Sequence, residues 1–191
     1  MHRSRSRDPC VEELSRSTIA VTMKAPARDR PKLPKGYITT EPKGMLTWSA
    51  VEKLLRAAPY FWIATTSDDG RPHLIQTWAV WIDQQLFFEG SERTRWARNL
   101  ARDNRISFGM QSGHNAAYGD GTTDVIRGVP AALARRIAAQ YGTKYGSGFK
   151  YRPKAEQYSG GHVFRVRPEK LIAFDVKKFN SSATRFTFPR A

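Results

Sequence analysis

Between Tyr60 and Leu100 the chain alternates short apolar segments with tight polar turns. In order, these are 60–67, Asp68-Asp69-Gly70, 72–82, Asp83-Gln84 and 85–90. An Asp-Gly pair favours the left-handed backbone conformations that two-residue hairpin turns need. Strands joined by such short turns form antiparallel hairpins. The stretch therefore predicts three consecutive antiparallel strands, followed by a helix over about 94–103.

The start of that helix combines a capping residue with arginines. Thr94 can accept a hydrogen bond from the first turn, and Arg93 and Arg95 flank it. Unpaired N–H groups and the helix dipole favour an anion at such a place. The same pattern is also typical of a capped surface helix with solvated arginines. The residues alone leave both interpretations open.

Periodicity predicts further elements on either side of this stretch. Thr47 can cap the first helix, and Leu133, Ile137 and Tyr141 share one face of a later helix. The expected elements are a helix over 47–58, a strand over 105–111, a loop over 112–121, a helix around 133–141, and strands over 162–167 and 170–176. About six antiparallel strands with two to three covering helices predict a mainly β, α+β fold, a small barrel.

The net charge of +15 raises the question of a polyanionic partner. Residues 1–36 hold nine Lys/Arg and four Asp/Glu with little apolar periodicity, which predicts a disordered basic extension before a domain over 37–191. No Lys/Arg run, zinc-finger spacing or RNP signature occurs, which argues against nucleic-acid binding as the main function. Met23 is a hypothetical true start, which mass spectrometry of the native protein would test.

Cysteine and histidine usage argue against disulfides and metal sites. Cys10 is the single cysteine, and His73, His114 and His162 lack a second ligand at metal spacing. No stretch approaches the roughly 18 apolar residues of a membrane span, and the first residues lack an apolar signal segment. The sequence predicts a cytoplasmic protein without a metal.

Several short motifs follow one another in a characteristic order along residues 36–190. They are GY at 36–37, YFWIATT at 60–66, DGRPH at 69–73, WAVW at 78–81, ARNL at 97–100, KYG at 144–146 and ATRF at 183–186. The ordered set resembles the pyridoxamine 5'-phosphate oxidase-like split β-barrel family, which binds FMN or the deazaflavin coenzyme F420. The resemblance implies a further strand over 122–130. It also implies a homodimer with the cofactor between the subunits.

The resemblance also implies roles for particular residues. The cofactor-binding set is Gln76, Thr77 and Trp78 near the ring, and Arg93, Thr94, Arg95, Trp96 and Asn99 near the phosphate. The substrate-side set is Trp81, Lys144, Tyr145 and Arg185. No catalytic acid or base is expected, because the cofactor carries the hydride chemistry.

The sequence departs from the family pattern in two places, at Trp96 and at the pair Gln76-Thr77. Trp96 stands where relatives carry a lysine that contacts the phosphate, and Gln76-Thr77 stands where many carry Pro-Val. Trp96 either lies against the ring and selects the cofactor, or packs inward with Leu100 one helical turn away. Gln76 and Thr77 add hydrogen-bonding groups near the ring, unless one of them faces solvent.

The expected function is hydride transfer between FMN or F420 and a small organic substrate. A true pyridoxamine phosphate oxidase is not expected, because no segment resembles the C-terminal dimerisation and substrate region of that enzyme. Two alternatives remain. One is a non-catalytic carrier of a flavin-like or tetrapyrrole ligand, and the other is a polyanion binder that uses residues 1–36.

Overall fold

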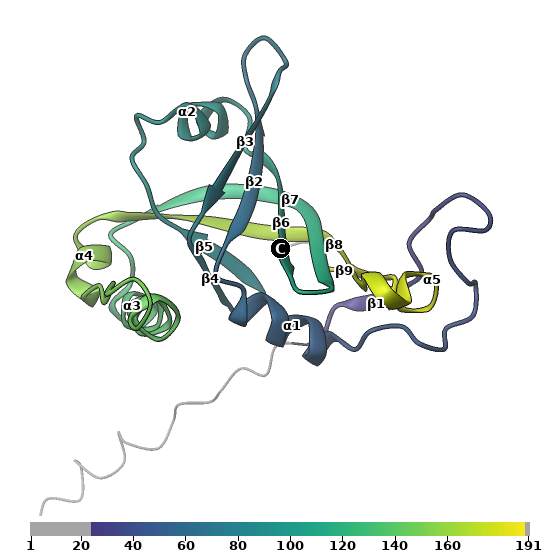
Figure 1. Cartoon of the computed structure of the whole chain (residues 1–191). Helices are drawn as coiled ribbons and strands as arrows, with labels where there is room; N and C mark the ends of the chain where they lie inside the picture. The colour runs from purple at the N-terminus through teal and green to yellow at the C-terminus, as the bar shows by residue number, and fades with distance from the viewer. Residues whose placement is uncertain (1–23, 190–191) are drawn as a thin grey trace, which may run out of the picture.

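The computed structural model describes residues 24–189 and consists of a strongly bent antiparallel sheet with helices around it (Figure 1). The strands are β1 (Ala27–Asp29), β2 (Phe61–Thr66), β3 (Pro72–Thr77), β4 (Ala79–Ile82), β5 (Gln85–Phe88), β6 (Arg105–Ser112), β7 (Asn115–Arg127), β8 (His162–Asp175) and β9 (Thr184–Thr187). The helices are α1 (Trp48–Ala57), α2 (Arg95–Arg102), α3 (Ala131–Tyr145), α4 (Ala155–Ser159) and α5 (Phe179–Ser182), with a short 3-10 turn η2 (Val176–Lys178). The predicted α+β class is confirmed. None of the helices in the described part of the chain is long and apolar enough to cross a membrane.

Six of the strand pairings join seven strands in a row that curves round on itself. The hydrogen-bonded order is β3–β2–β6–β7–β8–β5–β4, and β3 leads into β4 through Trp78 alone. The predicted strand over 72–82 is therefore one strand with a bend, which pairs with β2 before Trp78 and with β5 after it. Counting it once leaves the expected six strands. β9 and β1 extend the sheet beyond β8 and bring the number of described strands to nine.

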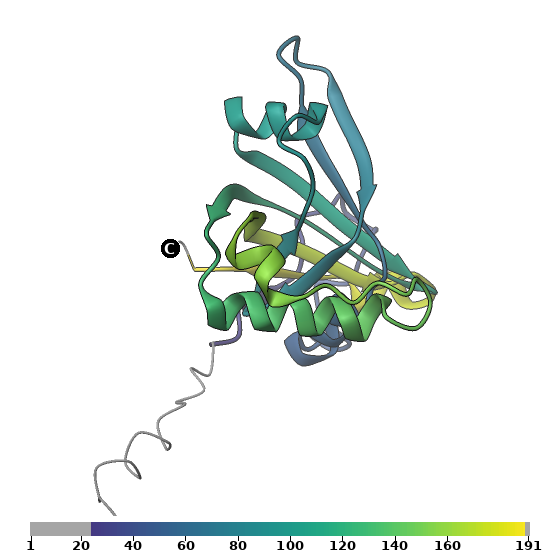
Figure 2. The same cartoon turned by 90° about the vertical axis from the view of Figure 1, so that its left-hand side faces the viewer.

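Alternation along the strands fills two cores. In β2, Phe61 and Ile63 are fully buried while Trp62 points outward. The first core lies inside the bent sheet around Trp81 and is covered by α1 and α2. The second lies between β4 and α3 around Tyr141. Both faces of β4 are thus buried. Figure 2 shows α3 and α4 packed together, with α2 away from them beside the tip of the β2–β3 hairpin.

The predicted loop over 112–121 was wrong, because this stretch is the hairpin of β6 and β7. Gly119 and Gly121 allow the backbone of β7 to lie close to that of β8. A Cβ on Gly119 would lie 2.2 Å from the Lys170 carbonyl oxygen, and one on Gly121 would lie 2.2 Å from that of Arg167. The ladder between β7 and β8 shifts register between Asp120 and Gly121. β8 continues through this bulge, so one long strand replaces the two predicted over 162–167 and 170–176.

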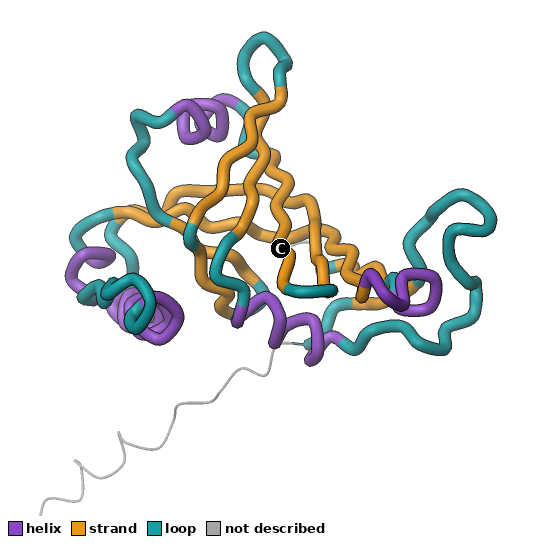
Figure 3. The backbone as a smooth tube through the Cα atoms, in the orientation of Figure 1, coloured by secondary structure: helices purple, strands orange, loops and turns teal. Residues whose placement is uncertain are grey.

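The prediction that disorder extends to residue 36 was wrong for residues 24–36 (Figure 3). Ala27–Asp29 form β1 and pair with β9. The Arg30 guanidinium donates hydrogen bonds of 2.5–2.9 Å to the carbonyl oxygens of Glu41, Lys43, Ser181 and Ala183. Backbone carbonyls, which no hydropathy pattern reveals, therefore fix this segment. Residues 1–23, and with them the hypothetical start at Met23, lie outside the described residues.

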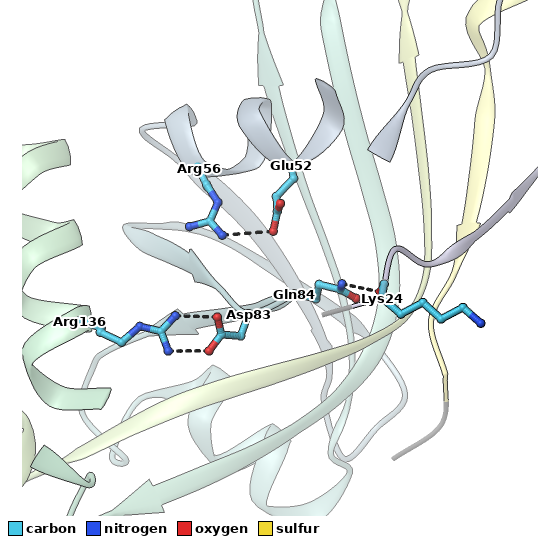
Figure 4. Close-up of polar contacts among 6 residues, drawn as sticks. All are labelled: Lys24, Glu52, Arg56, Asp83, Gln84 and Arg136. Carbon is cyan, nitrogen blue, oxygen red and sulfur yellow. Dashed lines mark hydrogen bonds and ion pairs between the residues drawn. The ribbon is translucent and has the colours of Figure 1, made fainter. Parts of the chain in front are cut away.

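The β4–β5 turn connects this N-terminal segment to α3 (Figure 4). Gln84 donates a 2.8 Å hydrogen bond from Nε2 to the carbonyl oxygen of Lys24. Asp83 forms two 2.6 Å contacts with the Arg136 guanidinium on α3. Both turn residues have positive φ, 49° and 58°, as the left-handed conformation of this turn requires. A hollow of about 680 Å³ beside Lys24 and Gln84 contains none of the predicted site residues.

Candidate functional site

Thr94 caps α2 as predicted. Its Oγ1 accepts a 3.4 Å hydrogen bond from the Ala97 amide and donates a 2.8 Å bond to the Ser91 carbonyl oxygen. The first amides of a helix have no partner within the helix, so the N-terminal end of α2 offers hydrogen-bond donors. Arg93 and Arg95 are exposed beside it. The start of α2 therefore combines backbone donors with two exposed arginines.

Arg95 is held in place by an uncharged partner, Ser67. Its Nη2 and Nε donate to Ser67 Oγ at 2.7 and 3.2 Å. Ser67 directly follows β2, faces inward like Thr65 two residues before it, and is 5% exposed. No described carboxylate lies within ion-pair distance of Arg95. The sequence analysis missed Ser67, although its place two residues after the buried Thr65 indicates that it faces inward.

The other two predicted phosphate residues of α2 face the core. Asn99 is 5% exposed and donates a 3.0 Å hydrogen bond from Nδ2 to Thr65 Oγ1. Trp96 is 7% exposed, with ring centroids 5.3 Å from Phe88 and 4.7 Å from Phe164. This placement favours the packing interpretation of Trp96. The two side chains anchor α2 to the sheet, so Arg93, Thr94 and Arg95 are the predicted phosphate residues that remain at the accessible start of the helix.

A second group of predicted residues gathers where β4 meets the end of α3. The Trp78 ring stacks on Tyr145 at 4.6 Å with 10° between the planes, and Phe149 lies 4.8 Å from Trp78. Tyr145 accepts a 3.1 Å hydrogen bond from the Ala79 amide and donates a 2.7 Å bond to the Pro59 carbonyl oxygen. This network fixes the bend at Trp78 against α3.

Burial shifts the acid–base behaviour of this second group. Lys144 donates a 2.8 Å hydrogen bond from Nζ to the Ala79 carbonyl oxygen and lies 5.5 Å from the Phe61 ring centroid. Removal of its ammonium from water lowers the pKa of Lys144 to about 8. Burial likewise raises the pKa of Tyr145 to about 12. An amine that titrates near pH 8 therefore lies beside an aromatic surface.

A carboxylate that the sequence analysis missed adjoins this group. Glu89 Oε1 accepts hydrogen bonds from the hydroxyls of Tyr151 at 2.8 Å and Tyr158 at 3.3 Å. Burial and the Glu89 carboxylate raise the pKa of both hydroxyls, that of Tyr151 to about 12. The signal in the sequence was weak, because the tyrosines lie more than 60 residues from Glu89.

The remaining predicted residues lie elsewhere. Trp81, a predicted substrate-side residue, is fully buried in the first core. Arg185 pairs with Asp29 at the junction of β9 and β1. Gln76 points outward next to Trp62 on β2, whereas Thr77 lies opposite the buried Phe61. Gln76 and Thr77 therefore face opposite sides of β3.

The two groups lie apart. The first is at the start of α2, beside Ser67 just after β2, and the second is at the end of α3, beside Pro59 just before β2. Figure 2 shows α2 and α3 apart from each other in the same way. No hydrogen bond or ion pair joins them among residues 24–189. The chain therefore presents a basic group at the start of α2 and an aromatic–amine group at the end of α3, apart from each other.

Comparisons with known proteins agree on the fold. A conserved hypothetical protein, Rv2991, from Mycobacterium tuberculosis is 18% identical with a TM-score of 0.59, over 84% of this chain and 96% of that one. A putative 5-nitroimidazole antibiotic resistance protein from Bacteroides thetaiotaomicron is 11% identical with a TM-score of 0.54, over 85% and 91%. HutZ, a heme storage protein from Vibrio cholerae, is 20% identical with a TM-score of 0.50, over 63% and 89%.

At such identities these likenesses concern the fold alone. No curated protein sequence matches the chain. The profile of the family described as pyridoxamine 5'-phosphate oxidase matches residues 47–175, which is more than half of the 191 residues. This range contains α2, the bend at Trp78 and the end of α3. The chain therefore belongs to the pyridoxamine 5'-phosphate oxidase family.

Proposed function

We propose that this protein is an oxidoreductase that binds FMN or the deazaflavin F420 by its phosphate at the start of α2. The observation that carries the proposal is the Arg95 guanidinium, which the uncharged Ser67 holds beside the capped helix end. When bound, the cofactor supplies the hydride chemistry. The protein itself binds and orients the cofactor and the substrate.

The donor set at α2 fits a phosphate group. Arg95 supplies charge-assisted hydrogen bonds, and the first-turn amides that Thr94 positions supply neutral ones. Arg93 adds positive charge at the exposed side of the cap. Position 96 is a tryptophan that packs in the core, so the positive charge that the family's lysine supplies is missing here. Arg95 therefore carries a larger share of the phosphate binding.

A homodimer would complete the site, because the two groups of a single subunit lie apart. The sheet offers an outward row in which Trp62 and Tyr118 flank Gly109 on the intervening strand β6. Trp62 is 46% exposed and Tyr118 48% exposed. Exposed apolar surface of this kind is typical of protein–protein contact. Gln76 continues the row beyond Trp62, so its amide would face a ring bound between subunits.

The aromatic–amine group then serves the substrate. Trp78 and Phe149 provide an apolar wall, and Lys144 provides a cation for an anionic group of a small organic substrate. The pKa of Lys144, about 8, keeps the amine mostly protonated at neutral pH. Protonation makes it a binding group and not a nucleophile under those conditions.

Substitution of Arg95 tests the phosphate site. Arg95→Ala should weaken FMN or F420 binding by roughly tenfold to a hundredfold, the value of a charge-assisted hydrogen bond. Arg105→Ala is the matched control, because Arg105 is exposed and pairs with Asp103 at 2.7 Å. Affinities come from fluorescence titration, and melting curves check the fold. Equal losses in the two variants would contradict the proposal.

Substitution of Trp62 tests the dimer. Trp62→Glu places a charge on the exposed row without touching the core, so the subunit should stay folded. The expected result is a monomer in analytical ultracentrifugation that binds the cofactor poorly. A monomeric variant with unchanged affinity would show that one subunit holds the whole site.

A carrier protein is the second candidate, and Trp96 favours it, because the missing lysine charge weakens the phosphate site. The absorption spectrum and mass of the molecule that co-purifies with the protein separate a flavin, a deazaflavin and a tetrapyrrole. Turnover then separates the enzyme from the carrier. Reduced cofactor that the purified protein binds but never oxidises with any acceptor would favour the carrier.

A further inference from the structure

A pocket of about 390 Å³ lies between α2 and strands β7 and β8. Its apolar wall comes from Ala97 and Leu100 on α2, Val125 on β7 and Phe164 on β8. Its volume lies within the range of pockets that hold small organic molecules. Apolar walls with a few polar groups are also typical of such sites.

This pocket is distinct from the proposed phosphate site, because the two use opposite flanks of α2. Positions 95, 99 and 102 follow the i, i+4, i+7 spacing of one helix face. All three contact the end of β2, at Ser67, Thr65 and the Thr66 carbonyl oxygen. Positions 97 and 101 lie on the opposite face and line the pocket. A ligand in the pocket therefore leaves Arg95 free.

A buried hydroxyl forms part of the pocket wall. Thr123 is 5% exposed, and its Oγ1 has no hydrogen-bond partner among the described residues. Its backbone amide donates to the Asn104 carbonyl oxygen, so strand pairing fixes the residue but leaves the hydroxyl unused. A buried polar group without a partner is destabilising. Rotation about the Cα–Cβ bond exchanges the hydroxyl with the methyl group and lets a bound ligand satisfy it.

Of the arginines that line the pocket, Arg127 forms an ion pair with a described carboxylate and Arg98 does not. Arg127 pairs with Glu92 at 2.5 Å, and Asp124 pairs with two arginines of β8, at 2.6 and 2.9 Å. Arg98 lines the pocket, is exposed, and forms no ion pair with a residue in the described part of the chain. The pocket therefore combines an apolar wall, the Thr123 hydroxyl without a hydrogen-bond partner and the Arg98 guanidinium without an ion-pair partner among the described residues.

We propose that this pocket binds a small organic anion with an aromatic or compact apolar body. The carboxylate of the ligand pairs with Arg98, its body lies against Phe164 and Val125, and a hydroxyl or carbonyl group satisfies Thr123. The proposal does not depend on the cofactor, because no residue of the phosphate site takes part.

Three related probes test each contact in turn by calorimetric titration of the full chain. The probes are 4-hydroxybenzoate, benzoate, which lacks the hydroxyl group, and 4-hydroxybenzamide, which lacks the charge. Arg98→Gln should weaken 4-hydroxybenzoate by about tenfold but change 4-hydroxybenzamide by less than about twofold. Arg135→Gln removes an exposed arginine from α3, outside the pocket, and should change neither.

Thr123→Val keeps the shape of the side chain and removes the hydroxyl. It should abolish the preference of the protein for 4-hydroxybenzoate over benzoate. Ala101→Phe fills the pocket from α2 and should prevent binding of all three probes, while melting curves check that the variants remain folded.

The results separate the proposal from its failure. Wild-type protein that binds none of the probes, or binds them equally well after Ala101→Phe, overturns the proposal. Equal effects of Arg98→Gln and Arg135→Gln overturn the assignment of the anion contact. A titration with FMN on the same variants distinguishes this outcome from a failure of the phosphate site, because Arg95 is unchanged in all of them.

Discussion

Lys144 should make the stability of this protein rise with pH between about 8 and 10.5. Its Nζ lies 2.8 Å from the Ala79 carbonyl oxygen, and burial lowers its pKa from 10.5 to about 8. In the unfolded chain the amine keeps its usual pKa of roughly 10.4. Between these values the unfolded chain binds more protons than the folded protein, so the free energy of unfolding increases with pH.

The expected size follows from the two pKa values. A difference of one pKa unit corresponds to about 1.4 kcal/mol. The shift from 10.5 to about 8 therefore amounts to about 3 kcal/mol. Below pH 8 this destabilising contribution is fully present, and above 10.5 it is gone. Lys144→Met removes it but also removes a charged hydrogen bond of about 1.5–3 kcal/mol. Near pH 7 the variant should be as stable as the wild type or more stable by up to ~1.5 kcal/mol.

Urea unfolding at a series of pH values from 7 to 10.5 measures this effect. The wild type should gain about 3 kcal/mol relative to Lys144→Met across the range. The comparison cancels tyrosine titration, which both proteins share. Lys53→Met controls for the loss of one positive charge from an exposed site on α1. Parallel curves for the wild type and Lys144→Met would refute the reasoning.

Three further substitutions test the packing of α2 and the β4–β5 turn. Trp96→Lys should cost several kcal/mol by burying an unpaired ammonium, and a lower melting temperature without a gain in FMN affinity would show this. Gly90→Ala places a Cβ 2.6 Å from the Trp96 ring; it should destabilise by about 1–3 kcal/mol, and a double-mutant cycle should show a smaller loss with Trp96→Leu. Asp83→Asn breaks the exposed pair with Arg136, whose hydrogen bond lowers the pKa of Asp83. The wild type should exceed this variant by less than about 1 kcal/mol near neutral pH, and acid titration of unfolding should show the difference vanish as the carboxyl protonates.

Local signals in the sequence predicted the elements whose cause is local. The β2–β3 hairpin follows from the Asp-Gly pair, where Gly70 has a φ of 81°. The α2 helix follows from its capping threonine, and α1 from Thr47, whose Oγ1 accepts a 3.3 Å hydrogen bond from the Ala50 amide. Each depends on contacts within a few residues, so no knowledge of the rest of the fold was needed.

The errors arose where distant segments decide the structure. Gly119 and Gly121 are typical of a loop when only their neighbours are considered, but β8 crosses so close to them that no side chain fits. β1 is held by pairing with β9, which lies more than 150 residues along the chain. Strand alternation puts Trp78 and Trp81, three residues apart, on opposite faces, but it does not show that α3 covers one face and α1 the other. Both faces of β4 are therefore buried.

The same distinction explains how much of the site could be predicted. Thr94 and the arginines beside it were predictable because a helix start is a local pattern. The partner of Arg95 was not, because Ser67 lies 28 residues away on another element. Trp96 depended on which face of α2 meets the sheet, and that face is set by Phe88 and Phe164.

One helix carries both proposed binding sites, and its anchoring explains how they can coexist. Trp96 fixes α2 between β5 and β8, and Asn99 fixes it to β2. Position 96 therefore attaches the helix to the sheet. Arg95 and Arg98, three residues apart, then point to different flanks, one toward β2 and one toward the pocket at β7. A lysine at position 96 would have added phosphate charge, but it would have loosened the helix that holds both arginines in place.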